Sequence, residues 1–239
     1  MLKHILIGLC TTIALCSAGL IASLQSQQNN SPIVKILVPT DKSKHDLNTL
    51  VHYRIQVSDV EDGESEYDEI AANEVFLEVR YLPDASKVNM DAMATADPKG
   101  LAAMKKSNCF TCHAFNGKLI APSFIEIAKR YPKTTANIDL LTKHIREGST
   151  GVWGTTSMPT HTELTIEETR NIVSWLLENA RDEYLNYYTG TEGNLKIKVP
   201  EGVSHKGAFV LSATYSDHGT KNNPQHFLSS KDVIVLYVK

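Results

Sequence analysis

The sequence predicts an α+β protein in which a helical domain is inserted between two segments of one β-sandwich. Three observations predict this arrangement. Strand-like alternation of apolar and polar residues occurs on both sides of the chain's middle, within 31–88 and 190–239. Four helix-start signals fall between these segments, in 97–180. An uncharged apolar stretch precedes all of these elements.

The composition is that of a folded protein. A chain of 239 residues is long enough for two small domains. Its 42% hydrophobic and 21% charged content excludes a wholly disordered chain, a collagen and a multi-pass membrane protein. The formal net charge is -3, so no basic field indicates binding to nucleic acid.

The first 24 residues have the layout of an export signal or an N-terminal membrane anchor. Ile5–Leu24 carries no charge and follows Lys3 and His4, and residues 25–32 then form a polar linker. Three alternatives stay open, namely a retained anchor, a cleaved signal sequence and a lipoprotein modified at Cys16. In each case we expect the remainder of the chain to be exported to the periplasmic side of a membrane.

The elements after the linker follow in order. Six strands are expected at 33–38, 50–57, 75–81, 195–199, 209–215 and 233–238. The helices are expected from Asp97-Pro98, over Ser123–Tyr131, from a cap at Asn137 to Gly148, and from a capping box at Thr165 to near Asn179. Four short helices have little core of their own, so a large apolar cofactor would complete the domain.

The strongest chemical signal is Cys109-Phe110-Thr111-Cys112-His113. C-x-x-C-H is the attachment motif of c-type haem, since two thiols add to the two vinyl groups of one haem and the adjacent histidine reaches the iron. A redox C-x-x-C, half of a zinc site and chance are the competing explanations. A zinc site needs two further Cys or His ligands close by, and a thioredoxin-like motif needs a βαβ unit. The sequence shows neither, and an export segment favours haem.

Residues 97–180 resemble a small bacterial class I monohaem cytochrome c. The resemblance rests on Cys109–His113, Ala121-Pro122-Ser123, Gly148–Gly154 and Ser157-Met158-Pro159. It implies His113 and Met158 as the two axial ligands of the iron. His161, three residues after Met158, is a rival ligand, but Met158-Pro159 matches the family's loop better.

The same resemblance implies three supporting residues. Pro122 matches the proline whose carbonyl accepts the N–H of the proximal imidazole. Trp153 matches a tryptophan whose indole N–H points at a haem propionate, with ordinary core packing as the alternative. His144 matches an Arg or His position near that propionate. We hypothesise that His144 titrates with haem oxidation, so that the reduction potential falls as the pH rises through the histidine range; an exposed helical histidine is the alternative.

The two β segments carry the motifs Pro39-Thr40-Asp41, Val57–Gly63 and Gly207–Asp217, on which they resemble exported bacterial Ig-like and PKD-like modules. Together 31–88 and 190–239 hold 108 residues, close to the ~100 of one Ig-type sandwich. We therefore expect a first sandwich part at 33–88, the haem domain at 92–188 and a second sandwich part at 190–239. Three consecutive separate units are the alternative. Seven carboxylates within Asp59–Glu69 indicate either a calcium site or a solvated loop.

These features predict an electron-transfer protein, not an enzyme, that carries one covalent haem c. The N-terminal segment would attach it to the membrane. Similar modules occur beside exported sugar dehydrogenases, which implies a dehydrogenase donor and a respiratory acceptor as redox partners. A haem sensor or peroxidase-type protein, and a β-module that binds glycan or protein with an accessory haem, remain alternatives.

Overall fold

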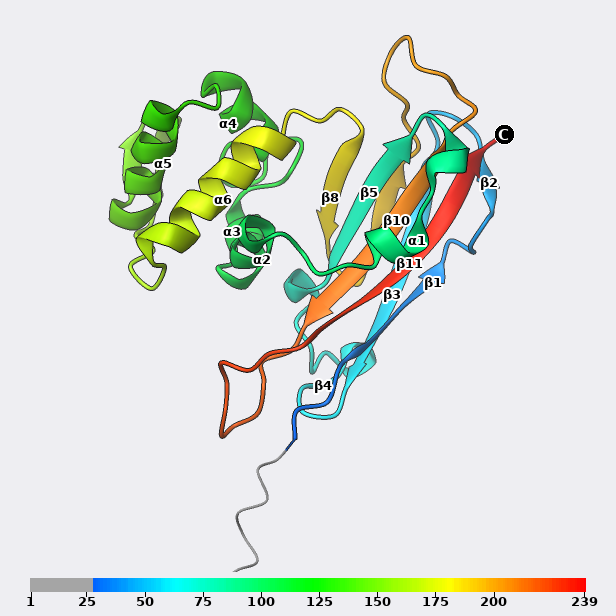
Figure 1. The fold of residues 1–239 in the computed structure, drawn as a ribbon, viewed down its shortest axis with the longest axis horizontal. Coiled ribbons are helices and arrows are strands. Elements are labelled where there is room, and N and C mark those ends of the chain that lie inside the picture. The colour runs from blue at the N-terminus through cyan, green and yellow to red at the C-terminus, as the bar shows by residue number, and fades with distance from the viewer. Residues whose placement is uncertain (1–27) are drawn as a thin grey trace, which may run out of the picture.

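The computed structural model describes residues 28–239 (Figure 1). The predicted signal sequence or anchor, residues 1–24, lies outside the described residues. Between residues 28 and 239 no helix has the length and apolarity needed to cross a bilayer. The strands are β1 (Ile33–Val38), β2 (Lys44–His45), β3 (Leu50–Asp59), β4 (Gly63–Glu64), β5 (Phe76–Leu82), β6 (Ser149–Gly151), β7 (Gly154–Met158), β8 (Leu185–Thr189), β9 (Glu192–Lys196), β10 (Ala208–Ser216) and β11 (Ser229–Val238).

Both flanking segments contribute to the same two sheets. One sheet contains β1, β3 and β4, with β9 also paired to β3, and the other has the order β2-β11-β10-β5-β8. The antiparallel pairs β3–β9 and β5–β10 each join a strand before the helical region to one after it. The strands on either side of the helical region are therefore hydrogen-bonded into shared sheets.

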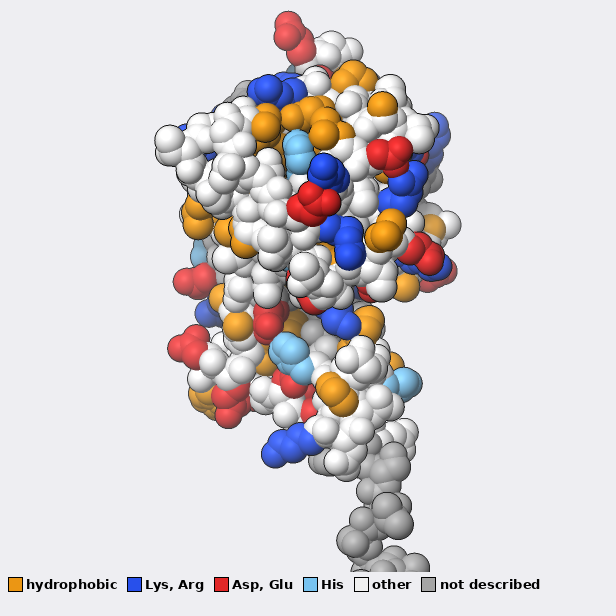
Figure 2. All heavy atoms as spheres, turned by 90° about the vertical axis from the view of Figure 1, so that its left-hand side faces the viewer, with side chains coloured by type: hydrophobic (Ala, Val, Ile, Leu, Met, Phe, Trp, Pro, Cys, Tyr) orange, Lys and Arg blue, Asp and Glu red, His pale blue; other side chains and the backbone are white. Residues whose placement is uncertain are grey.

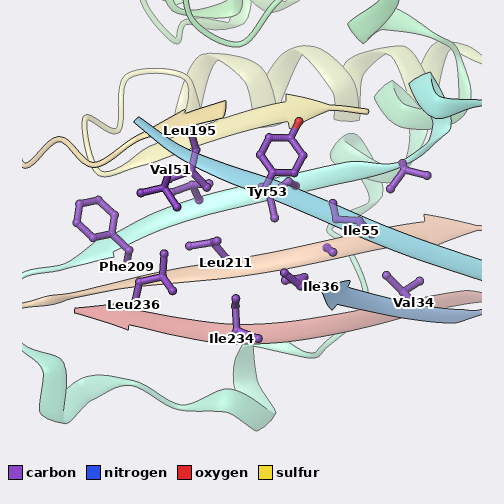
Figure 3. Packing of buried hydrophobic residues seen from close by; sticks show 14 of the residues in the cluster. Val34, Ile36, Val51, Tyr53, Ile55, Leu195, Phe209, Leu211, Ile234 and Leu236 are labelled. Carbon is purple, nitrogen blue, oxygen red and sulfur yellow. The ribbon is translucent and has the colours of Figure 1, made fainter. Parts of the chain in front are cut away.

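The two sheets enclose one hydrophobic core (Figure 3). Alternate residues of each strand face inward, as the pleat of a β-strand requires. The most buried members include Val57 and Leu77 from the first segment and Leu195, Leu211 and Leu236 from the second, all without exposed surface. The period-2 pattern thus located the core strands correctly, although β9 covers 192–196 and not 195–199.

The middle of the chain is helical. Its helices are α1 (Met90–Met93), α2 (Lys99–Lys106), α3 (Cys109–Cys112), α4 (Phe124–Arg130), α5 (Thr135–Glu147) and α6 (Ile166–Asn179). The predicted capping box of Thr165 and Glu168 starts α6, and Ser123 with Glu126 forms a second capping box at α4. Helix α5 differs from the prediction: Thr134 is its cap, accepting the backbone N–H of Asn137.

Strand β8 was not predicted, and it joins the two parts of the molecule. It pairs with β5 at the edge of its sheet, beside the helices (Figure 1). Phe76, Leu185 and Tyr187 face away from the sandwich core and belong to the hydrophobic cluster of the helical domain. Residues 185–188, which lie within the 92–188 range expected for the haem domain, are hydrogen-bonded into the sandwich.

Polar contacts reinforce this junction. The Asp97 carboxylate bridges Lys105 of α2 (2.6 Å) and Lys231 of β11 (2.7 Å), and all three side chains are nearly buried. The Tyr187 hydroxyl donates to Glu78 of β5, and Arg80 pairs with Asp182 at 2.9 Å. The helical domain is therefore packed and hydrogen-bonded against the outer face of one sheet.

The acidic run Asp59–Glu69 occupies the end of β3, β4 and the following turn. Most of its carboxylates have separate partners. Glu61 accepts from the Asn30 amide at 2.8 Å, Glu64 from the Ser58 hydroxyl, and Glu69 from the Glu64 N–H at 2.9 Å. No group of three or more His, Cys, Asp or Glu side chains in residues 28–239 is placed to hold a metal ion. The seven carboxylates therefore do not gather around one ion.

Candidate haem site

A cavity of about 260 Å³ lies within the helical domain. Its walls come from α2, α3, the loop before α4, α4, α5, the hairpin β6–β7 and α6. Cys109, Cys112 and His113 of the C-x-x-C-H motif and Met158 of the later loop all line it. Most of the other lining side chains are apolar; they include Met104, Pro122, Phe124, Ile127, Leu141, Ile145, Ile172, Val173 and Leu176.

The single turn α3 presents the two cysteines. Asn108, in the left-handed region at φ 56°, precedes this turn, and the His113 N–H bonds to the Cys109 carbonyl at 3.0 Å. The Cys112 carbonyl accepts the N–H groups of Ile120 and Ala121, which folds the next loop back over the turn. Burial raises the pKa of Cys109 to about 12, so this side chain is a neutral thiol.

His113 is held in one orientation. Its Nδ1 lies 2.6 Å from the Pro122 carbonyl oxygen, which can only accept, so Nδ1 carries the hydrogen. The ring stacks on Phe124, with centroids 5.4 Å apart and planes at 21°. Burial lowers the pKa of His113, although the bond to Pro122 opposes this shift. A neutral imidazole with a free Nε2 is the form that binds a metal.

Met158 ends strand β7 of a hairpin that folds over the cavity. The hairpin pairs Ser149 with Met158 and Gly151 with Gly154, and Gly148, at φ 80°, turns the chain from α5 into it. Met158 is half-buried. Met104 also lines the cavity, but it is fully buried within the helical core.

These side chains fit a covalently attached haem. Two thiols three residues apart match the two vinyl groups, an oriented imidazole nitrogen and a thioether sulfur are the donors of a His/Met pair, and the remaining walls are mostly apolar. Cys109, Cys112, His113 and Pro122 would hold the group from α3 and the following loop, and Met158 from the hairpin.

Comparison with known proteins decides the family. The family model described as cytochrome c matches residues 98–180. Cytochrome c-551 of Ectopseudomonas mendocina is 35% identical over 78 residues, which cover 33% of this chain and 94% of the relative. The chain belongs to the cytochrome c family. Residues 98–180 form a class I monohaem cytochrome c domain, and β-strands flank it on both sides.

Other cytochromes show the same similarity. Cytochrome c-552 of Hydrogenobacter thermophilus is 32% identical over 73 residues, covering 30% of this chain and 74% of the relative. The crystal structure of Nitrosomonas europaea cytochrome c552 has 29% sequence identity and a TM-score of 0.32, covering 33% of this chain and 96% of that chain. The two sequence matches thus cover 94% and 74% of these small cytochromes and about one third of this protein.

The other predicted residues of the cytochrome domain have distinct positions. His144 of α5 and Trp153 of the hairpin turn both line the cavity. Trp153 is 41% exposed, and the Arg130 guanidinium lies 4.9 Å from its ring centroid, so it is not an ordinary core residue. His161 is not among the lining residues, and its Nδ1 bonds to Glu163 at 2.7 Å.

Sequence reasoning missed two residues of this site. Phe124 stacks against the His113 ring. Its place at the start of α4, just after Pro122, could have indicated from the sequence that it lies near His113. Met104, which lies upstream of the haem motif, was not predicted to line the cavity. Only the packing of α2 against α6 shows that it reaches the cavity.

Proposed function

We propose that this protein is a single-electron carrier with one haem c, attached through Cys109 and Cys112 and ligated by His113 and Met158. It works on the exported side of a membrane, to which its N-terminal segment attaches it. The observation that carries the proposal is the single apolar cavity that brings these four side chains together. The identity of this domain as a cytochrome c supports the covalent haem and the electron-carrier role.

The bound haem supplies a reversible one-electron iron couple. The chain contributes the environment of that couple. Each thiol would hold the group through a thioether, formed by addition of its S–H across a vinyl double bond, which would need no external oxidant. Pro122 keeps the Nδ1 hydrogen of His113 in place, so Nε2 would be free to act as a neutral donor to the metal. The apolar walls exclude water, and a neutral thioether from Met158 raises the reduction potential.

The two ligand side chains favour a carrier over a haem enzyme or sensor. If His113 and Met158 both hold the iron, a substrate would have to displace one of them in order to bind. Cytochrome c domains of this kind are typically electron carriers and not enzymes. We therefore prefer electron transfer to the sensor, peroxidase and binding-module alternatives.

The rim of the cavity suits a brief encounter with a redox partner. Ile120 is 56% exposed and Trp153 is 41% exposed, and both lie at the rim beside exposed Lys118. Figure 2 looks onto this side of the molecule, where apolar, basic and acidic side chains mix. Weak redox encounters use small interfaces. We propose an exported dehydrogenase as donor and a respiratory protein as acceptor, with the β-sandwich, an Ig-like module, as a spacer or docking platform.

The first experiment is the visible spectrum of the protein produced in a host that matures c-type cytochromes. A His/Met carrier gives a covalent low-spin haem with the weak Met–iron charge-transfer band and no change with carbon monoxide. A high-spin spectrum, or one that carbon monoxide shifts, would refute the proposed ligand pair and favour sensing or catalysis. N-terminal sequencing of the mature protein tests the anchor, since a start after residue 18 would show cleavage.

A matched pair of variants tests the sixth ligand. Met158→Leu removes the proposed sulfur and should abolish the charge-transfer band and allow carbon monoxide to bind. Met104→Leu changes the other methionine that lines the cavity and should keep both properties. The opposite result would assign the ligand to Met104. His161→Ala is the control for the rival ligand and should leave the band unchanged.

A further inference from the structure

Two buried aspartates lie at the end of the sandwich where strands β3 and β10 end. Inward-facing residues of β3 alternate from Val51 to Val57, and Asp59 follows in the same phase with 6% exposure. The inward residues of β10 end at Tyr215, and Asp217 follows with 4% exposure. The Tyr215 hydroxyl lies 2.7 Å from the Asp62 carboxylate, so the ends of the two strands, and with them both carboxylates, lie at the same end of the core.

Hydrogen bonds connect these aspartates with the start of the described chain. Asp59 Oδ1 accepts the N–H groups of Glu61 (2.9 Å) and Asp62 (2.8 Å). Asp62 in turn accepts from the Tyr215 hydroxyl at 2.7 Å and from the His218 backbone at 3.0 Å. Asn29 Nδ2 donates to Asp217 Oδ2 at 3.0 Å and to the His226 carbonyl at 2.9 Å.

Two oxygens of this cluster are buried without a hydrogen-bond partner. They are Asp59 Oδ2 and Asn29 Oδ1, and across residues 28–239 only Thr142 Oγ1 shares this property. A buried oxygen without a partner is costly, and a bound ion or water molecule is one way to satisfy it. A proton on Asp59 would not remove the cost, because a protonated Oδ2 would itself need an acceptor.

No lysine or arginine neutralises the two aspartates. Within residues 28–239, neither Asp59 nor Asp217 forms an ion pair with a lysine or arginine, and His218 at this end pairs with Asp62 and Glu74 instead. Burial raises the pKa of Asp59, and the Asp62 and Glu61 carboxylates add to this shift while two backbone N–H bonds oppose it.

We propose that this end of the sandwich binds one calcium ion through Asp59 Oδ2 and Asn29 Oδ1, beside Asp217. Calcium accepts carboxylate, amide and backbone carbonyl oxygens together in irregular geometry, so a mixed ligand set does not require three converging carboxylates. The ion would fasten the segment before β1 to the loops that follow β3 and β10. In Figure 1 these loops lie beside the point where the grey trace meets the chain. The site is independent of the proposed haem function.

The test is thermal unfolding of the full haem-loaded protein in EGTA and in 10 mM calcium, followed by circular dichroism in the β region. With a dissociation constant of about 10⁻⁴ M, as in many extracellular modules, the melting temperature should rise by about 5–10 °C. Calorimetric titration should give one ion per chain. An unchanged melting temperature of the unaltered protein would overturn the proposal, and an equal rise with magnesium would overturn the assignment to calcium.

Variants locate the site. Asp59→Asn keeps the Oδ1 acceptor but removes the charge, so it should weaken calcium binding at least tenfold while being no less stable than the parent in EGTA. If Asp59 had only a structural role, the Asp59→Asn variant would instead lose stability equally in both conditions.

Asn29→Ala, on an outer segment, tests the second ligand if Asp59→Asn does not fold. Glu66→Gln, an exposed carboxylate of the same run, should respond like the parent; loss of its response would indicate diffuse charge screening and refute the site. The visible haem spectrum should be the same in all variants.

Discussion

The sandwich and the cytochrome domain bury their apolar side chains in different ways. The sandwich closes a continuous core between two sheets, and backbone hydrogen bonds join strands from both ends of the chain. The cytochrome domain packs short helices around a cavity, and it adds Phe76, Leu185 and Tyr187 from the sandwich to its own cluster. One domain fills its core with its own side chains, whereas the other encloses a cavity and shares its hydrophobic cluster with side chains of its neighbour.

This difference explains how the insertion is accommodated. Strand β5 leads into the helical domain and β8 leads out of it, and these two strands are paired with each other. The domain therefore starts and ends at adjacent strands of one sheet, which suits an inserted unit. The sandwich supplies part of the wall that the small helical domain lacks.

Removal of the haem attachment should have the largest effect. Cys109→Ser with Cys112→Ser should abolish covalent haem, and the helical signal should fall because the apolar cavity walls lose their filling. Absorbance of the denatured protein and far-ultraviolet circular dichroism measure the two effects. Thr111→Ala, between the cysteines, should keep both. Unchanged helicity without haem would show that the helical core is complete by itself.

Core truncations in the sandwich should come next. Leu77→Ala and Leu211→Ala alter fully buried residues before and after the inserted domain, so each should lower the free energy of unfolding by about 3 kcal/mol. Both should shift the same cooperative transition in urea, because the two segments share one core. Leu50→Ala, at a 69% exposed position, is the control. Effects on two separate transitions would favour independent β-units.

The junction between the domains should give an intermediate effect. Tyr187→Phe keeps the ring against Phe115 and Trp175 but removes the hydroxyl that donates to Glu78. We expect a loss of about 1–2 kcal/mol, with the helical transition moving away from that of the sandwich. The exposed Tyr67→Phe should be neutral. If Tyr187→Phe left the free energy of unfolding unchanged, the apolar contacts alone would hold the junction.

The smallest expected effect is a pH dependence at the acidic end of the sandwich. Burial lowers the pKa of His218, but the carboxylates of Asp62 and Glu74 raise this pKa by more than burial lowers it, so the net shift is upward. The stabilisation is present in full below the pKa of the unfolded state and is lost as the pH rises through that of the folded state.

The urea midpoint of unfolding in EGTA should therefore fall from pH 6 to pH 8. The His218 side chain is 60% exposed, so solvent screening should keep the contribution to about 1 kcal/mol or less. His218→Gln should flatten this slope, and exposed His52→Gln should not. Equal slopes in the parent and His218→Gln would exclude the ion pairs of His218 as the source of the pH dependence.

Local signals explain the successful predictions. The capping box at Thr165 and the period-2 strands depend on neighbouring residues alone, so sequence located α6 and the main sandwich strands. Strand β8 lacked such a pattern because both of its faces are covered: Tyr187 packs on the cytochrome domain and Tyr188 on the sandwich core. The cap at Thr134 was mistaken for Asn137 because both residue types cap helices, and only the backbone decides between them.

By itself, the sequence determined the haem chemistry and the alternation of strands and helices. The spacing of Cys109, Cys112 and His113 reflects the covalent attachment of a haem. Because these residues are neighbours in the chain, the motif can be recognised from the sequence alone. Only the tertiary structure decided that two distant segments share one core, that Met104 and Met158 reach the same cavity, and that Asp59 and Asn29 leave buried oxygens unpartnered. These features depend on contacts between residues far apart in the chain, which no local pattern encodes.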